Sequence, residues 1–258
     1  MGELERRLRA VRAGGGKAFV PYVTGGYPGV DADLLRALAD AGADAIEVGI
    51  PHSDPVMDGG VIQGASRVAL EEQHTRPADV LAVVKEAGAG VPVAVMTYIN
   101  PVASMGFAVF CEALDAAGVA GVIVPDLPVD EAGPFAEASG DRGIDLVLLA
   151  APGTSHERYE AIGHAAHGFV YCVATYGVTG TRAGLDETAR RVVEALRPHT
   201  DLPLLVGVGI ATPEAATEAC SFADGVIVGS ALMRALIEAG PRALVEFAAG
   251  FRAALPRA

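Results

Sequence analysis

The chain contains no tryptophan, and aromatic residues make up only 5% of its 258 positions. A folded core must therefore be built from aliphatic side chains, and an apolar content of 51% supplies enough of them. Charged residues reach only 20%, so the composition excludes a disordered chain. A core of Ala, Val, Ile and Leu is typical of proteins whose parallel strands are covered by helices on both faces.

Basic residues are also scarce, since 19 Lys and Arg stand against 32 Asp and Glu and give a formal net charge of −13. This balance excludes a nucleic-acid partner, because neutralising the phosphates of a duplex needs clustered Lys and Arg. A single small phosphate stays compatible with the composition. Backbone N–H groups at the start of a helix bind such a group without any formal charge.

Cysteine is rare, and Cys111, Cys172 and Cys220 lie far apart among apolar residues. An odd number at such spacing is typical of reduced thiols in a core, so we expect a cytoplasmic protein. No segment is long enough to span a membrane without Gly, Pro or charge, and we expect no membrane partner. The first residues mix Glu3 and Glu5 with arginines, which predicts an amphipathic N-terminal helix and not a signal peptide.

A unit of helix, glycine and apolar strand recurs along the chain. In one copy Asp31 can cap a helix with Leu34, Leu35 and Leu38 on its apolar face, and Gly42 follows that helix. Eight runs are apolar on both faces, which favours a parallel sheet covered by helices: Ala18–Val23, Ala45–Pro51, Val93–Thr97, Gly121–Pro125, Leu146–Pro152, Gly168–Val173, Leu204–Gly207 and Gly225–Gly229.

Eight such units predict one α/β domain over residues 1–258, a closed (β/α)8 TIM barrel with an extra N-terminal helix. The alternative is an open, doubly wound sheet. Such a sheet normally has a Gly-rich fingerprint in its first strand–helix turn, and the turn after Val23 does not fit G-x-G-x-x-G.

Polar residues occur where the predicted strands end, which is the active-site end of such a barrel. Glu47 interrupts the second strand, and Asp58 lies in the Pro- and Gly-rich loop that follows it. A glutamate in an apolar strand is costly unless it is paired or neutral, and desolvation raises its pKa into a range useful for proton transfer. The alternatives are a Glu47 paired with a buried Arg or Tyr, and an Asp58 that only forms a turn.

Three late loops are rich in glycine: residues 177–180, residues 207–210, and Gly229 with Ser230. The last of them opens a predicted helix, whose first N–H groups have no partner within the helix. Each loop alone could be a tight turn. Their order at successive strand ends predicts a phosphate site, because many barrels bind phosphate after strands seven and eight.

Taken together, these residues resemble one family, the α subunit of tryptophan synthase, over nearly the whole chain. The most specific stretches are Glu47–Pro55, Asp58–Gly59 with Ile62–Gln63, Tyr98–Pro101, Pro125–Pro128 and Gly177–Gly180. The resemblance implies a lyase of tryptophan biosynthesis that cleaves indole-3-glycerol phosphate by a retro-aldol reaction to indole and glyceraldehyde 3-phosphate. It also implies that the reaction needs no cofactor and no metal.

The resemblance further implies a role for each matching residue. Glu47 would move the protons, and Asp58 would accept the indole N–H. Tyr171 would hold Glu47 in place, and Thr179 would bond Asp58 when a mobile loop over residues 174–186 closes. The remaining matches are three supporting residues (Tyr98, Asn100 and Asp126), four phosphate donors (Gly180, Gly209, Gly229 and Ser230), and the indole pocket residues Tyr22 and Val208.

Two loops depart from the family pattern. His52, Met57 and Gly60 stand where an aromatic, a small residue and proline are commoner, and residues 174–176 also differ. Because these loops contact the β subunit in the family's α2β2 complex, we also consider a stand-alone lyase of a secondary pathway and a non-catalytic barrel that activates a partner. We consider a ring-substituted indole as substrate as well, because Val208 and Met57 can alter the volume of the pocket. A Schiff-base aldolase or another phosphosugar enzyme is a weaker alternative, because the only lysines, Lys17 and Lys85, are not at the carboxyl end of a predicted strand.

Overall fold

Eight parallel strands form a closed barrel in the computed structural model, which describes residues 1–173, 182–207 and 209–258. Each strand pairs with the next, and β8 returns to β1 with Ala18 opposite Gly225. This closure confirms the predicted barrel and rules out the open sheet. The strands are β1 (Ala18–Thr24), β2 (Ile46–Gly49), β3 (Val93–Met96), β4 (Gly121–Ile123), β5 (Asp145–Ala150), β6 (Val170–Val173), β7 (Leu204–Gly207) and β8 (Gly225–Val228).

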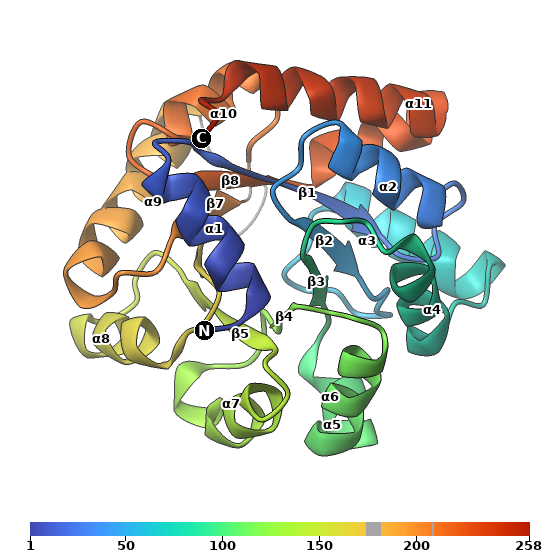
Figure 1. Cartoon of the computed structure of the whole chain (residues 1–258), viewed down its shortest axis with the longest axis horizontal. Coiled ribbons are helices and arrows are strands. Elements are labelled where there is room, and N and C mark those ends of the chain that lie inside the picture. The colour runs from blue at the N-terminus through green and yellow to red at the C-terminus, as the bar shows by residue number, and fades with distance from the viewer. Residues whose placement is uncertain (174–181, 208) are drawn as a thin grey trace.

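The helices surround the barrel, as Figure 1 shows. They are α1 (Glu3–Ala13), α2 (Ala32–Asp40), α3 (Gly60–Arg67), α4 (Pro77–Ala87), α5 (Ile99–Met105), α6 (Phe107–Ala116), α7 (Gly133–Gly140), α8 (His156–Ala165), α9 (Arg182–Leu196), α10 (Pro213–Ala219) and α11 (Ser230–Ala254). Short helical turns occur at η1 (Val68–Glu72), η2 (Val129–Glu131) and η3 (Arg197–His199). Helix α11 is kinked at Gly240, which has a φ of 86° and precedes Pro241.

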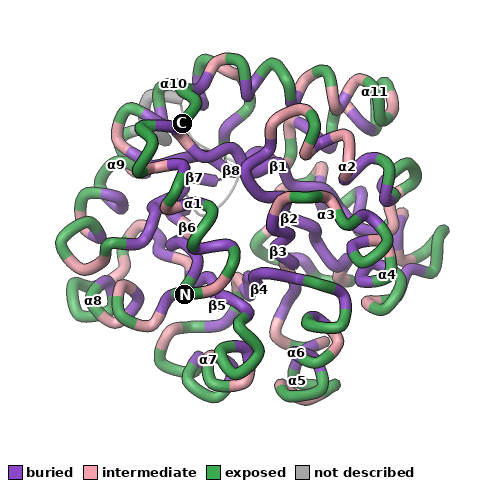
Figure 2. Tube along the Cα trace, in the orientation of Figure 1, coloured by how far each residue is buried: buried purple, intermediate pink, exposed green. Residues whose placement is uncertain are grey.

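The strands are buried almost throughout, with Met96, Leu149 and Tyr171 half-buried, while the helices expose their outer sides (Figure 2). In β1 all seven residues are buried. Helix α2 shows the local cause: Asp31 accepts a hydrogen bond from the N–H of Leu34 at 2.9 Å, as predicted, and the helix buries Leu34, Leu35 and Leu38. The chain then turns through Gly42, whose φ of 97° favours glycine.

Helix α1 closes the amino end of the barrel, which confirms the predicted extra helix. Its Leu4 is fully buried and lies so close to β4 that a Cβ on Gly121 would sit 2.5 Å from the leucine Cδ2. Asp145, the first residue of β5, accepts hydrogen bonds from the N–H groups of Gly2 and Glu5 and so caps the helix. Because α1 fills the amino end of the barrel, we expect an open binding site at the opposite end, where the strands have their carboxyl ends.

A buried ion pair ties the end of α11 to the same region. The Arg252 guanidinium lies 2.9 Å from Asp44, whose carboxylate also accepts a hydrogen bond from the N–H of Phe19 in β1. Arg252 donates to the carbonyls of Lys17 and Pro256 as well. The first strand and the last helix are thereby joined by charge-assisted hydrogen bonds.

The three cysteines are free and buried. Burial raises the pKa of the Cys111 thiol and raises that of Cys220 to about 11, so both stay protonated at neutral pH. Burial raises the pKa of the Cys172 thiol as well. Among the described residues, no helix combines the length and the apolar character needed to cross a lipid bilayer.

Candidate active site

A cavity of about 870 Å³ opens at the carboxyl ends of the strands. Much of its wall is apolar, with contributions from Ile62, Met96, Ile123, Leu149, Val173 and Ile227. Several polar side chains line the same space, among them Tyr22, Glu47, Asp58 and Tyr171. An apolar cavity with a few convergent polar groups suits a small molecule that combines a flat apolar part with a polar tail.

Glu47 lies on β2 opposite Tyr22 of β1, and its side chain is 1% exposed. Its Oε2 atom has no hydrogen-bond partner within the described part of the chain. Burial, together with the nearby charge of Asp58, raises the pKa of Glu47 to about 8. In the folded protein this carboxyl therefore carries a proton at neutral pH.

Asp58 lies on the loop between β2 and α3 and is held by residues of two elements. The Tyr98 hydroxyl donates to its Oδ2 at 3.0 Å and accepts from the N–H of Met57 at 3.1 Å. The Gln63 amide donates to the Asp58 carbonyl at 2.9 Å. Burial raises the pKa of Asp58 to about 6, and the Tyr98 bond opposes that rise. At neutral pH Asp58 is mostly ionised.

The two carboxyl groups therefore have different protonation states in one cavity. Glu47 is poised to donate a proton, and Asp58 is poised to accept a hydrogen bond or to face a positive charge. Pairs of titratable groups whose surroundings separate their pKa values in this way are a frequent arrangement in acid–base catalysis.

Two tyrosines, Tyr22 and Tyr171, also belong to the polar lining. The Tyr22 hydroxyl lies 3.3 Å from Oγ1 of Thr24, and burial raises the pKa of both Tyr22 and Tyr171, so both phenols stay protonated. Tyr171 fits because β7 has a glycine beside it: a Cβ on Gly207 would sit 2.1 Å from its hydroxyl. Within the described residues no hydrogen bond joins Tyr171 to Glu47, so the structure contains no direct bond by which Tyr171 would hold Glu47 in place.

The far rim of the cavity is formed by Gly209, Gly229 and Ser230. Ser230 begins α11, and the Met233 N–H makes the first intrahelical bond back to the Gly229 carbonyl at 2.9 Å. The N–H groups ahead of Met233 therefore need partners from outside the helix. Of the other predicted ligand contacts, Thr179, Gly180 and Val208 lie outside the described residues.

Asn100 and Asp126 are exposed and do not line the cavity. Asp126 accepts a hydrogen bond from the N–H of Ile99 at 2.9 Å, at the start of α5. This contact links the loop after β4 to the residue next to Tyr98. Asp126 is placed to position Tyr98, and through it Asp58. Asn100 lies in the first turn of α5.

The lining residues that sequence reasoning did not predict include Arg234 and Phe247, both from α11. Arg234 follows Ser230 by four positions, so the helical period places both residues on one face. That spacing was visible in the sequence. Phe247 lies beyond the kink at Gly240, and no pattern in the sequence brings it to the cavity.

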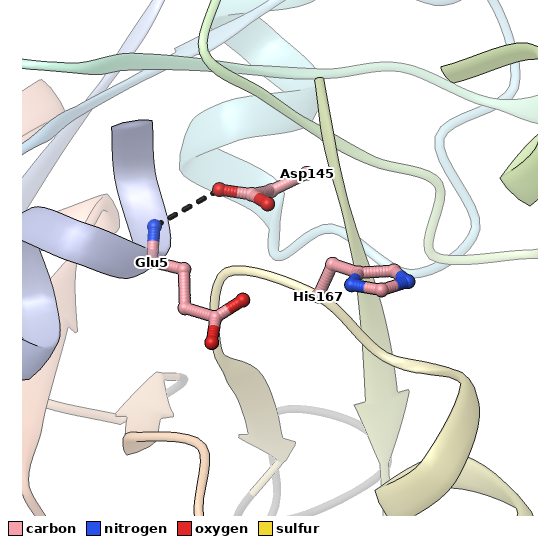
Figure 3. Close-up of side chains that lie close together, drawn as sticks. All are labelled: Glu5, Asp145 and His167. Carbon is pink, nitrogen blue, oxygen red and sulfur yellow. Dashed lines mark hydrogen bonds between the residues drawn. The ribbon is translucent and has the colours of Figure 1, made fainter. Parts of the chain in front are cut away.

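A second cluster of potential ligands lies at the opposite end of the barrel. In the described residues, Glu5, Asp145 and His167 have donor atoms within 4.8 Å of one another (Figure 3). Asp145 already accepts two backbone N–H bonds, and Glu5 pairs with Arg9 at 2.7 Å. We assign Asp145 and Glu5 to the anchoring of α1 and not to the chemistry of the cavity.

Comparisons with known proteins agree with this geometry. A family model described as "Tryptophan synthase alpha chain" matches residues 8–249. The tryptophan synthase alpha chains of Streptomyces avermitilis and Alkalilimnicola ehrlichii are 44% and 47% identical, over 92% and 90% of this chain and 86% of each relative.

Among solved structures, one of Mycobacterium tuberculosis tryptophan synthase has a TM-score of 0.92 at 39% identity and covers 100% of this chain and 99% of its own. Tryptophan synthase subunit alpha from Legionella pneumophila has a TM-score of 0.88 at 34% identity, with 98% of each chain covered. The resemblance and the lyase class predicted from the sequence are thereby confirmed. This chain belongs to the tryptophan synthase alpha chain family.

Proposed function

We propose that the chain cleaves indole-3-glycerol phosphate to indole and glyceraldehyde 3-phosphate, as a tryptophan synthase α subunit. One observation carries the proposal: a protonated Glu47 and an ionised Asp58 share an apolar cavity whose far rim is a helix N-terminus. An indole ring suits the apolar wall, and a phosphate suits the rim.

The reaction is a proton transfer coupled to carbon–carbon cleavage. The Glu47 carboxyl donates its proton to ring carbon C3, and the positive charge that develops reaches the ring nitrogen. The side-chain hydroxyl nearest the ring then loses its proton to the Glu47 carboxylate while the bond to C3 breaks. Glu47 ends as it began, and no external reductant or oxidant is consumed.

Asp58 accepts the indole N–H and stabilises the positive charge on that nitrogen. Its ionised state suits this role, and the Tyr98 bond fixes its direction. At the other end, the N–H groups near Gly209, Gly229 and Ser230 hold the phosphate. By family resemblance we assign Gly180 to the phosphate, Thr179 to Asp58, and Val208 with Tyr22 to the indole pocket.

We propose the tryptophan synthase β subunit as the partner, in an α2β2 complex. The loop between β2 and α3 presents Val56 at 77% exposure and Met57 at 38% beside the cavity. Exposed apolar side chains at a site mouth suit an apolar partner surface. We also propose a single domain over residues 1–258 and a cytoplasmic location, where the buried thiols stay reduced.

The test is indole release by the purified chain from indole-3-glycerol phosphate. We expect Glu47→Gln and Asp58→Asn each to lower turnover by at least about a hundredfold, the scale of a positioned acid or base. Asp54→Asn is the matched control, because Asp54 lies on the same loop, is exposed and is not part of the cavity lining. Turnover near the wild-type level in either active-site variant would refute the assignment.

Adding a β subunit separates the two versions of the lyase. Strong activation by the β subunit indicates an α subunit that works inside the complex. Fast turnover of the isolated chain, unchanged by the β subunit, indicates the stand-alone enzyme. Tight binding of the β subunit with no cleavage under either condition indicates the non-catalytic barrel.

A further inference from the structure

The cavity has one cationic side chain among its described lining residues, Arg234, while Glu47 and Asp58 are its acids. The whole chain carries a formal charge of −13. A phosphate monoester near neutral pH carries about −1.5 to −2 charges. Backbone N–H groups offer only partial positive charge to such a ligand. A nearby guanidinium would supply the formal countercharge that the rim lacks.

Helix geometry directs Arg234 toward that rim. Arg234 lies one turn after Ser230, and Ser230, Ala231 and Arg234 all line the cavity. Side chains on a helix lean toward its N-terminus, so the arginine extends back over the turn whose N–H groups need outside partners. Its length and its fork of donors suit a phosphate that these N–H groups already hold.

The guanidinium of Arg234 is also uncommitted. Glu238 follows it by one turn, yet within the described residues Arg234 forms no ion pair. The other two arginines downstream on α11 are engaged, Arg242 with Glu246 at 2.8 Å and Arg252 with Asp44 at 2.9 Å. A cation without an ion-pair partner among the described residues is therefore available for a ligand at the mouth of the cavity.

We propose that Arg234 is a substrate-binding residue that pairs with the phosphate of the ligand held at Gly229 and Ser230. This inference rests on the proposed function, since it assumes a phosphate at that rim. Arg234 contributes affinity and selectivity for the anionic ligand and takes no part in proton transfer. It acts on the ground state and the transition state alike.

The experiment compares Arg234→Gln and Arg234→Lys with Arg242→Gln, an exposed arginine of the same helix, as the control. Calorimetry measures the binding of glycerol 3-phosphate and, separately, of indole, which has no phosphate. We expect Arg234→Gln to weaken glycerol 3-phosphate binding about tenfold, the scale of one charge-assisted hydrogen bond at an exposed site. Indole binding stays unchanged, Arg234→Lys keeps most of the affinity, and KM for indole-3-glycerol phosphate rises about tenfold at constant kcat.

The possible failures are distinct. If Arg234→Gln and Arg242→Gln bind glycerol 3-phosphate equally well, Arg234 does not contact the phosphate and the inference is wrong. Equal loss of indole and glycerol 3-phosphate binding points to damage of the cavity and also overturns it. If the wild-type chain cleaves the substrate but Arg234→Gln changes only activation by a β subunit, the residue belongs to the partner surface. If the wild-type chain does not bind glycerol 3-phosphate, the rim is not a phosphate site, and the proposed function is wrong as well.

Discussion

Replacing Glu47 by glutamine should make the protein more stable while it removes activity. Gln has the shape of the protonated carboxyl but cannot ionise. Wild-type Glu47 is buried, and its pKa rises from 4.5 to about 8 in the folded chain. Between these values the folded protein holds a proton that the unfolded chain has released. The contribution of Glu47 to the free energy of unfolding therefore falls as pH rises through this interval, and that contribution is most favourable below pH 4.5.

The size of the effect follows from the two pKa values. Each pKa unit corresponds to about 1.4 kcal/mol. Compared with a side chain that stays neutral, wild-type Glu47 lowers the free energy of unfolding by less than about 1 kcal/mol at pH 5 and by about 3 kcal/mol at pH 7. Above pH 8 the cost levels off near about 5 kcal/mol. Glu47→Gln avoids this cost and should gain that much over the wild type.

Urea unfolding at about pH 5, about pH 7 and about pH 8.5 measures the difference between the two proteins. We expect the gap in unfolding free energy to widen steadily with pH, with Asp54→Asn showing no such trend. A gap that stays constant from pH 5 to pH 8.5 would show that the pKa of Glu47 is not raised. If the difference in unfolding free energy widens with pH but Glu47→Gln keeps wild-type activity, Glu47 has a raised pKa but does not have its proposed catalytic role.

Three further predictions concern other contacts. Tyr98→Phe removes the hydroxyl that donates to Asp58, so we expect the pKa of Asp58 to rise above about 6. The acidic limb of the pH–activity profile should then move to higher pH, and a limb that does not move would mean that the bond is unimportant. Gly207→Ala places a Cβ 2.1 Å from the Tyr171 hydroxyl and should lower the free energy of unfolding by about 1–3 kcal/mol. Gly250→Ala on α11 places a Cβ with no atom within 4 Å and should raise it by about 0.5–1 kcal/mol. Thermal melts that rank these two variants the other way would contradict the packing argument. Arg252→Met removes the buried partner of Asp44, which keeps the half-exposed Arg7 at 3.1 Å, and should cost about 1.5–3 kcal/mol in urea unfolding, the scale of a hydrogen bond between charged groups. Arg242→Met at an exposed pair should change stability by under about 0.5 kcal/mol, and equal effects of the two variants would mean that the buried pair contributes no more than a surface pair.

Much of the barrel was predictable because its determinants are local. Each apolar run is long enough for one strand, and caps such as Asp31 together with Gly42 mark where α2 begins and where the chain turns back. Glu47 was predictable for the same reason, because a charged residue inside an apolar strand is visible in a short window. The start of α11 at Ser230 followed from the glycine before it.

Other features depend on contacts between distant residues, which periodicity does not encode. The bond between Tyr98 and Asp58 joins two loops 40 positions apart, and it decides how Asp58 is held. Asp126 belonged to the predicted site, yet its carboxylate accepts from Ile99 and lies outside the cavity. Phe247 lies beyond the kink of α11 at Gly240, so the straight helical period that starts at Ser230 does not predict its place in the lining.

The burial of all three thiols makes the protein a ready subject for site-specific labelling. A maleimide reacts with a thiolate at the surface, and the native cysteines are buried with their thiols protonated. A Val56→Cys variant would place one reactive sulfur at the 77% exposed tip of the β2–α3 loop. A dye attached there would report the arrival of another subunit, and no native cysteine would first have to be replaced.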